Sequence, residues 1–81
     1  MRTARLFTMT ANAAGEAALA FFLARGVRVD VRDVGKDEEA SLELFNLAGR
    51  RAVPTVVIDE RGFLGFAENR EEIESLLREP R

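Results

Sequence analysis

Residues 48–58 read Ala-Gly-Arg-Arg-Ala-Val-Pro-Thr-Val-Val-Ile, and this stretch decides how the rest of the chain is interpreted. Gly49 readily takes the left-handed conformation that ends a helix, so a helix is expected before it. Pro54 fixes its own φ and has no N–H to donate, and the apolar run Thr55–Ile58 that follows is typical of a buried strand. The stretch therefore predicts a helix, a turn at the proline and then a strand.

Upstream of this stretch, the pattern predicts two strands separated by a helix. Arg5–Met9 is a short apolar run, and Val27–Val34 alternates valine with charged residues, which is the period of a half-buried strand. Between them, Glu16–Arg25 is rich in alanine and leucine and predicts a helix. Asn12 is suited to cap its N-terminus, and Gly26 its C-terminus.

Acidic residues and turn residues mark the remaining elements. The sequence Asp37-Glu38-Glu39 opens a second helix, where carboxylates complement the helix dipole. Asp59–Gly62 is expected to turn the chain, with the glycine at positive φ. Phe63–Phe66 is expected to form a short fourth strand. A last helix is predicted over Arg70–Arg78, with Asn69 as its cap.

The predicted core consists of apolar side chains on one side of each element. Phe63 and Phe66 are three residues apart in a predicted strand, so they should point to opposite faces, with Phe63 in the core and Phe66 exposed. The helical residues expected on buried faces are Leu19, Phe22, Leu23, Leu42, Leu44, Phe45, Leu47, Ile73 and Leu76.

The order of elements is therefore β-α-β-α-β-β-α. The first β-α-β unit should be a right-handed parallel crossover, whereas the last two strands should form an antiparallel hairpin. A four-stranded mixed sheet with three helices satisfies both constraints and defines an α/β fold. We expect residues 1–81 to form a single domain, because a chain of 81 residues has room for one core only.

Composition excludes several kinds of chemistry. The sequence contains no cysteine and no histidine, which removes disulfides, the usual zinc sites and any Cys or His nucleophile or base. The 12 basic and 14 acidic residues form no basic block, so nucleic acid is not an expected partner. The carboxylates of Asp37–Glu39 and Glu71–Glu72 fit helix N-termini better than a metal site. No apolar run is long enough for a membrane span or a signal peptide, so a cytoplasmic protein is expected.

The order of elements, the length and three local motifs resemble those of glutaredoxins, which have the thioredoxin-like fold. Residues 48–58 resemble the family's glycine–arginine, Thr-Val-Pro and apolar strand. Phe63–Phe66 resembles the glycine-containing stretch before the last helix. The spacing of Arg5–Val27 is similar to that between the family's first strand and the end of its first helix.

The resemblance also places the family's Cys-x-x-Cys motif, which carries thiol–disulfide exchange, on Asn12-Ala13-Ala14-Gly15. Neither end residue of this segment has a thiol, so the resemblance implies the family's fold without its thiol–disulfide exchange activity. Asn12 is then either a plain N-cap or a ligand contact at the helix N-terminus. A register shifted by one residue would instead place alanines at the two cysteine positions.

The resemblance further implies a binding site for glutathione or an extended peptide. Pro54 matches the family's cis-proline, and the backbone of Val53 would pair with the ligand; an ordinary trans proline at the start of an edge strand is the alternative. Arg51 matches the residue that contacts the ligand's glycyl carboxylate, unless it is a solvated charge near a helix C-terminus. The loop of Gly65 and Phe66 would meet the γ-glutamyl end.

Two functions follow as hypotheses. The first is a redox-inactive binding or adaptor domain whose groove accepts glutathione, a peptide or a protein partner. The second is a thiol–disulfide oxidoreductase or electron donor whose cysteines this chain lacks. The sequence predicts no bound metal and no resident cofactor, and it leaves the oligomeric state open.

Overall fold

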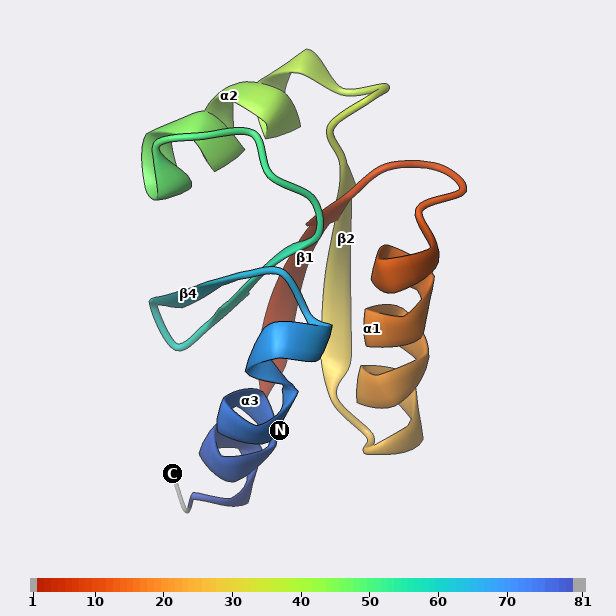
Figure 1. Ribbon diagram of the computed structural model, residues 1–81, viewed down its shortest axis with the longest axis vertical. Coiled ribbons are helices and arrows are strands. Elements are labelled where there is room, and N and C mark those ends of the chain that lie inside the picture. Colours follow the sequence, from red (N-terminus) through yellow and green to blue (C-terminus); the bar gives the residue numbers. More distant parts are fainter. Residues whose placement is uncertain (1, 80–81) are drawn as a thin grey trace.

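The computed structural model describes residues 2–79 and has the predicted order of elements (Figure 1). Its sheet order is β2-β1-β3-β4, with β1 parallel to β2 and the other pairs antiparallel. The thioredoxin-like fold expected from the sequence is thereby confirmed. The elements are β1 (Thr3–Thr8), α1 (Ala13–Ala24), β2 (Arg28–Asp33), α2 (Glu38–Ala48), β3 (Thr55–Ile58), β4 (Arg61–Leu64), the 3-10 turn η1 (Ala67–Asn69) and α3 (Arg70–Arg78).

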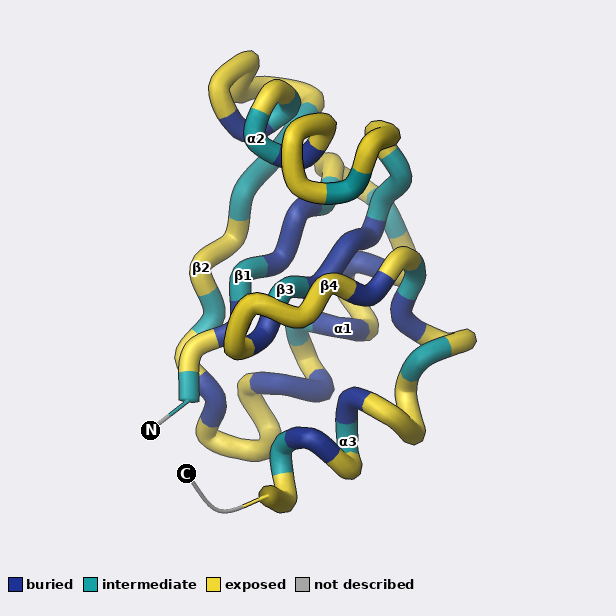
Figure 2. Tube along the Cα trace, turned by 90° about the vertical axis from the view of Figure 1, so that its left-hand side faces the viewer, coloured by how far each residue is buried: buried dark blue, intermediate teal, exposed yellow. Residues whose placement is uncertain are grey.

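The two faces of the sheet are covered unequally. Helices α1 and α3 pack on one face, where Phe22 and Ile73 are fully buried together with Leu6 of the central strand β1. Helix α2 lies on the opposite face and covers one end of the sheet (Figures 1 and 2). No helix within residues 2–79 is long and apolar enough to cross a membrane.

Helix α2 buries less of its apolar surface than the sequence predicts. Leu44 is fully buried, but Leu42, Phe45 and Leu47 are 50%, 46% and 55% exposed, so their prediction as core residues is wrong. The reason is that α2 touches the sheet at one end only, and a single row of its side chains faces the strands. Leu23 on α1 is likewise exposed, because it lies on the side of that helix turned away from the sheet.

The hairpin between β3 and β4 turns earlier than predicted. Asp59 and Glu60 have φ angles of 50° and 69°, whereas Gly62 lies within β4 and has no positive φ. Two successive residues at positive φ are typical of the tight turn that matches strand twist in a two-residue hairpin. The prediction of Gly62 as the positive-φ residue is therefore wrong, and β4 begins and ends two residues earlier than expected.

This turn allows a test on stability. Replacing Glu60 with glycine should raise the free energy of unfolding by about 1 kcal/mol, because an L-residue pays that cost in the left-handed region. Urea denaturation of the two proteins measures the difference. The control is Gly62→Ala, whose new Cβ would meet nothing within 4 Å and whose φ is ordinary. A destabilised Glu60→Gly variant would contradict the turn.

Candidate functional site

The first turn of α1 begins at Asn12, as the sequence predicts. The Oδ1 atom of Asn12 accepts a hydrogen bond from the Gly15 N–H at 2.7 Å, so this side chain is a working N-cap. The residue before it, Ala11, has a φ of 65°, which directs the chain from β1 into the helix. Ala13 and Ala14 are exposed, and their N–H groups precede the first intrahelical bonds. The helix thus opens with two N–H groups that are not taken up by the cap.

Gly15 packs directly on β1, a contact that the sequence analysis missed. The glycine is buried, and a Cβ built on it would lie 1.9 Å from the Oγ1 atom of Thr8 and 2.9 Å from its Cβ. The Thr8 hydroxyl is itself buried and has no hydrogen-bond partner among the described residues. Position 15 therefore has no room for any side chain while Thr8 is present. A glycine in the first turn of an otherwise alanine-rich helix was the only sign of this contact in the sequence.

The turn before β3 is the second part of the candidate site. The Val53–Pro54 peptide bond is cis. The Pro54 carbonyl accepts a hydrogen bond from the Gly65 N–H at 2.8 Å, and the Thr55 hydroxyl donates to the Ala52 carbonyl at 2.7 Å. The backbone N–H and C=O of Val53 have no such partner within residues 2–79. The turn is thus held on both sides of Val53, whose own polar groups are left unused.

These two parts share Thr8 as a neighbour. In the pairing of β1 with β3, Phe7 is opposite Thr55, so Pro54 directly precedes the first paired residue of β3, at the end of β1 that carries Thr8. Gly15 packs on the same threonine from the helix side. Figure 1 shows the segment after α2 returning to the end of β1 from which the chain leaves for α1. The fold therefore brings the helix N-terminus and the proline turn to the same end of β1.

Arg51 is close in sequence to this turn, but its side chain is bonded to α2. Its Nε donates to the Ser41 hydroxyl at 2.8 Å, and its guanidinium lies 5.0 Å from the centre of the Phe45 ring. Both Arg51 and the neighbouring Arg50 are exposed. A carboxylate bound by Arg51 would use its Nη groups, because the Nε already donates to α2.

Phe66 is a core residue, so the prediction that it is exposed is wrong. Its side chain is 6% exposed, and its ring centre lies 5.2 Å from that of Phe21 in an edge-on contact. The reason is that β4 ends at Leu64 and Gly65, with a φ of 88°, turns the chain toward α1. Near the site, Phe66 can offer a ligand only its backbone.

Asn69 occupies the cap position of α3 without capping it. Its side-chain amide donates to the carbonyl of Leu64 at 2.7 Å and to that of Gly65 at 3.2 Å, and no cap hydrogen bond forms. The prediction of Asn69 as a side-chain cap is therefore wrong. Its amide instead holds the turn that carries Gly65 beside Pro54.

The loop that leads into α1 is tied to the end of β2. The Thr10 hydroxyl donates to the Asp33 carboxylate at 2.8 Å, and this bond is the main cause of the lowered pKa of Asp33. Backbone N–H groups of Gly35 and Lys36 donate to the same carboxylate and act in the same direction. These bonds fix the loop that precedes the helix N-terminus.

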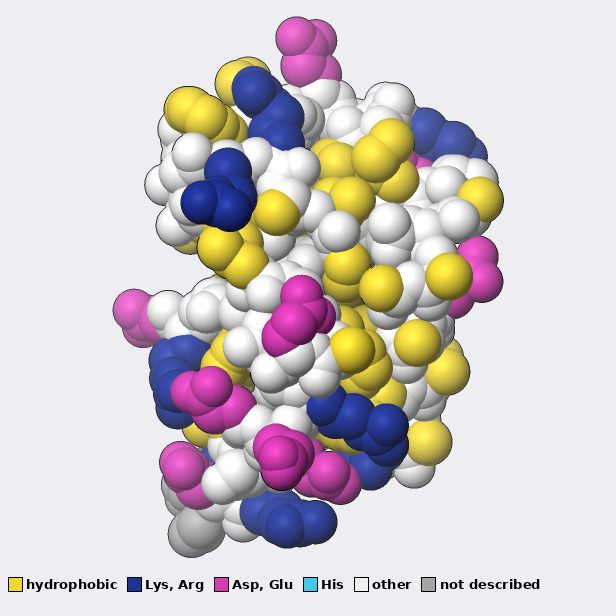
Figure 3. Space-filling model, in the orientation of Figure 1, with side chains coloured by type: hydrophobic (Ala, Val, Ile, Leu, Met, Phe, Trp, Pro, Cys, Tyr) yellow, Lys and Arg dark blue, Asp and Glu magenta, His cyan; other side chains and the backbone are white. Residues whose placement is uncertain are grey.

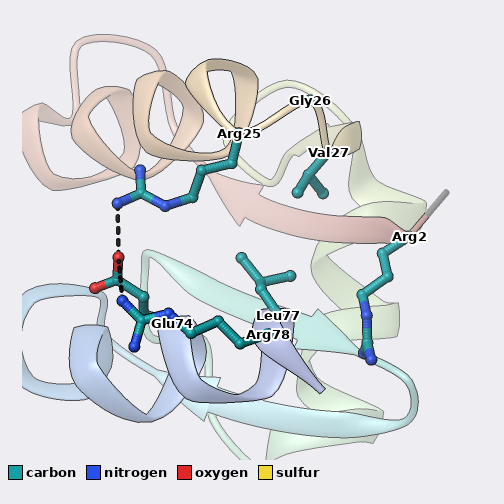
Figure 4. A pocket seen from close by; sticks show the side chains of 7 residues that line it. All are labelled: Arg2, Arg25, Gly26, Val27, Glu74, Leu77 and Arg78. Atoms are coloured by element: carbon teal, nitrogen blue, oxygen red, sulfur yellow. Dashed lines mark hydrogen bonds and ion pairs between the residues drawn. The ribbon is translucent and has the colours of Figure 1, made fainter. Parts of the chain in front are cut away.

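Two cavities are lined by residues other than Asn12, Val53 and Pro54, although Thr55 of the proline turn borders one of them. One of about 370 Å³ is found where the end of α1 meets α3 and is lined by Arg2, Arg25, Gly26, Val27, Glu74, Leu77 and Arg78 (Figure 4). Another, of about 240 Å³, lies in the hollow between α2 and the β3–β4 hairpin (Figure 3). It is lined by Leu47, Ala48, Thr55, Val57, Gly62 and Leu64. The part of the chain that the structure describes holds no cluster of three or more Asp or Glu residues suited to a metal ion.

Glu74, in the first of these cavities, gives the fold an acid-sensitive ion pair. Arg25, the C-cap residue of α1, donates to its carboxylate at 2.8 Å, and this bond is the main cause of the lowered pKa of Glu74 (Figure 4). Because the folded pKa lies below the unfolded one, the stabilising effect is present above the ordinary value of 4.5 and disappears as the pH falls through the folded pKa.

Replacing Glu74 with glutamine should therefore lower stability at pH 7, and the difference from wild type should shrink to nothing in acid. Urea denaturation from pH 7 to pH 2 measures the difference. Glu71→Gln, an exposed position in the same helix, is the control and should show a smaller change. A Glu74→Gln difference that is constant with pH would contradict the assignment.

Comparison with known proteins gives a consistent family. The family model described as glutaredoxin matches residues 6–63. The glutaredoxin of Archaeoglobus fulgidus is 24% identical, with a TM-score of 0.78 over 98% of this chain and 89% of that one. The thioredoxin-like protein BC3987 is 26% identical, with a TM-score of 0.81 over 90% of this chain and 97% of that one. A buckwheat glutaredoxin–glutathione complex is 17% identical, with a TM-score of 0.72 over 94% and 74%. No curated protein matches the sequence.

Proposed function

The chain belongs to the glutaredoxin family, and from this premise we propose that it is a redox-inactive binding domain that holds glutathione or an extended peptide. The sequence has no cysteine anywhere, so no thiolate can attack a disulfide. At the place of the motif, Asn12 is occupied as a helix cap and Gly15 is closed in by Thr8. The part of the family's binding site that this chain retains consists of main-chain N–H and C=O groups.

The unused backbone of Val53 is the observation that carries this proposal. Its N–H and C=O are free to add an extended ligand in the manner of a short strand, beside Pro54, whose carbonyl is fixed by Gly65. The exposed N–H groups at the start of α1 favour a carboxylate of the same ligand. We include Arg51 and the backbone of Phe66 as outer contacts, and we place the domain in the cytoplasm, where glutathione keeps thiols reduced.

A titration of the isotope-labelled protein with reduced glutathione tests the proposal. Amide signals of Val53, Gly65 and Ala13 should shift together and saturate in the millimolar range. Arg51→Ala should weaken the affinity two- to five-fold, because an exposed charge pair contributes at most about 1 kcal/mol. Arg50→Ala is the matched control, since it is equally exposed and adjacent, and it should bind like wild type.

One outcome would reject glutathione as the ligand, and another would reject Arg51 as a specific contact. If no amide shifts at 10 mM glutathione, the small ligand is rejected. If Arg50→Ala and Arg51→Ala weaken binding equally, the ligand responds to the general charge of the loop rather than to a contact at Arg51.

The other candidate function is thiol–disulfide exchange, the reaction associated with the family's motif. It requires a thiol, which no residue of the sequence supplies. Assays that reduce a mixed disulfide of glutathione or the disulfides of insulin should therefore show no rate above that of the buffer. Any turnover by the purified protein would overturn the redox-inactive assignment.

A further inference from the structure

Strand β2 forms one edge of the sheet, and within residues 2–79 only β1 pairs with it. Figure 2 shows β2 running along one side of the molecule, with no other segment beyond its middle part. An open edge of this kind is a template for another strand unless charged residues or other devices block it. The composition of β2 therefore decides whether the edge is protected or available.

The hydrogen bonds at the two ends of β2 show which backbone groups point outward. Arg28 N–H donates to the Arg2 carbonyl, and Val34 N–H donates to the Thr8 carbonyl, so the even-numbered residues face β1. Because alternate residues of a strand point their polar groups to opposite sides, those of Val29 and Val31 face outward. The Asp33 carbonyl is already taken by Asp37 N–H at 2.9 Å.

The side chains of β2 do not repel a second copy of the same strand. Asp30 and Arg32 lie on the α2 face, where they are 3.5 Å apart and where Arg32 also pairs with Glu43 at 2.8 Å. Val31 lies on the other face and is 46% exposed. The edge thus carries an exposed valine between two opposite charges, an arrangement that is complementary to itself.

We propose that two copies of this chain pair antiparallel through β2, related by a two-fold axis at Val31. In this register Asp30 of each copy is opposite Arg32 of the other, and the two Val31 side chains are neighbours on the α1 face. The outward polar groups of both Val31 residues then bond to each other. This association is separate from the binding function proposed above and involves none of its residues.

Other registers fit less well. An axis at Asp30 would place Asp30 opposite itself and Arg28 opposite Arg32, and an axis at Arg32 would place two arginines together; like charges directly opposite are destabilising. An axis at Val29 would also keep opposite charges together, and each of these two registers engages one backbone group that is already bonded, the Val27 N–H or the Asp33 carbonyl. The axis at Val31 is favoured because it brings together the more exposed of the two valines.

Single cysteines test the register, because the chain has no other thiol. In Val31→Cys the two Cα atoms would lie about 5.5 Å apart across the axis, within the range that a disulfide spans. Mild oxidation should therefore join most of this variant into a covalent dimer. In Arg28→Cys, an exposed position on the same strand, the thiols would lie six residues out of register, about 20 Å apart, and cross-linking should be at least ten-fold slower.

Equal cross-linking of the two variants would overturn the pairing, and faster cross-linking of Val29→Cys than of Val31→Cys would overturn the register. Sedimentation equilibrium from 10 µM to 1 mM provides a test without cysteines. Wild type should approach the mass of a dimer as concentration rises, since a short edge contact is smaller than a standard stable interface. A monomer mass throughout that range would also overturn the proposal.

A lysine at the two-fold axis should abolish the association of the two copies. Val31→Lys places two ammonium groups together and should remain monomeric across the same concentrations. The control is Leu64→Lys, a comparably exposed residue on β4 at the opposite edge, which should associate like wild type. The reverse result, with Leu64→Lys monomeric and Val31→Lys dimeric, would assign association to the other edge and reject β2.

Discussion

Replacing Phe66 with alanine should lower the free energy of unfolding by about 3–5 kcal/mol, the cost of removing a buried aromatic ring from a packed core. The ring is 6% exposed and contacts both Phe21 and Phe22, at centre-to-centre distances of 5.2 and 6.4 Å. These three rings join the start of the last helical segment to α1. Urea denaturation at pH 7 measures the loss.

Phe45→Ala is the matched control for this experiment. It removes the same side chain from a position that is 46% exposed, so its effect should be below about 1 kcal/mol. If Phe66→Ala fails to fold, Phe66→Leu keeps much of the apolar volume and should give a measurable, smaller loss. Equal losses for Phe66→Ala and Phe45→Ala would mean that residue 66 lies at the surface, as the alternation of the sequence suggested.

The error at Phe66 shows what a two-residue period cannot detect. Alternation assigns faces only while the strand continues, and β4 stops at Leu64. Gly65 then takes a left-handed φ, which reverses the direction in which the next side chain points. The hairpin turn was misplaced for a different reason: positive φ was expected at Gly62, but it is adopted by Asp59 and by Glu60, and glutamate is not a residue type that favours this conformation.

Elements with strong local signals were predicted well. Strand Thr55–Ile58 and helix Arg70–Arg78 have the bounds expected from the sequence. The helix expected to open at Asp37–Glu39 begins at Glu38, with Glu38 and Glu39 in its first turn, and Gly49 ends it as predicted with a φ of 75°. Each of these features depends on residues within a few positions of one another, so a single stretch of sequence contains all the necessary information.

The exposure of α2 and the closure of the site depend on distant residues. Whether Leu42 and Leu47 are buried is decided by how much sheet lies beneath α2, which no pattern within the helix records. The contact of Thr8 with Gly15 likewise joins a strand to a helix. The sequence alone shows that the thiols are missing, but only the fold shows that Thr8 closes the second thiol position, Gly15.

That contact makes a second large effect measurable. Gly15→Ala would ordinarily stabilise a helix by about 1 kcal/mol, but here it should cost about 2–3 kcal/mol, because the new Cβ would meet Thr8 Oγ1 at 1.9 Å. Rotating the threonine about χ1 can remove the Oγ1 contact, but it does not remove the clash, because the Thr8 Cβ stays at 2.9 Å in every rotamer. Urea denaturation again gives the free energies.

The cost should depend on residue 8 in a fixed order. Thr8→Ala removes the Oγ1 contact and leaves the Cβ contact, so it should relieve part of the cost of Gly15→Ala. Thr8→Gly removes both the Oγ1 and the Cβ contact, so it should relieve nearly all of the cost of Gly15→Ala. In each case the cost is the difference in unfolding free energy between the residue-8 variant with and without Gly15→Ala. If Gly15→Ala costs the same in wild type, in Thr8→Ala and in Thr8→Gly, the coupling energy between positions 8 and 15 is zero and the contact is contradicted.

The same geometry bears on the proposed loss of redox chemistry. Asn12→Cys should fold with only the cost of a lost cap, about 1 kcal/mol, because position 12 is not closed by a neighbour. Adding Gly15→Cys should cost as much as Gly15→Ala, since the clash begins at the Cβ, and Thr8→Gly should restore stability to the double-cysteine variant. If the two cysteines are instead accepted without any change at Thr8, then Gly15 does not close the site, and the redox-inactive state depends on the missing sulfur alone.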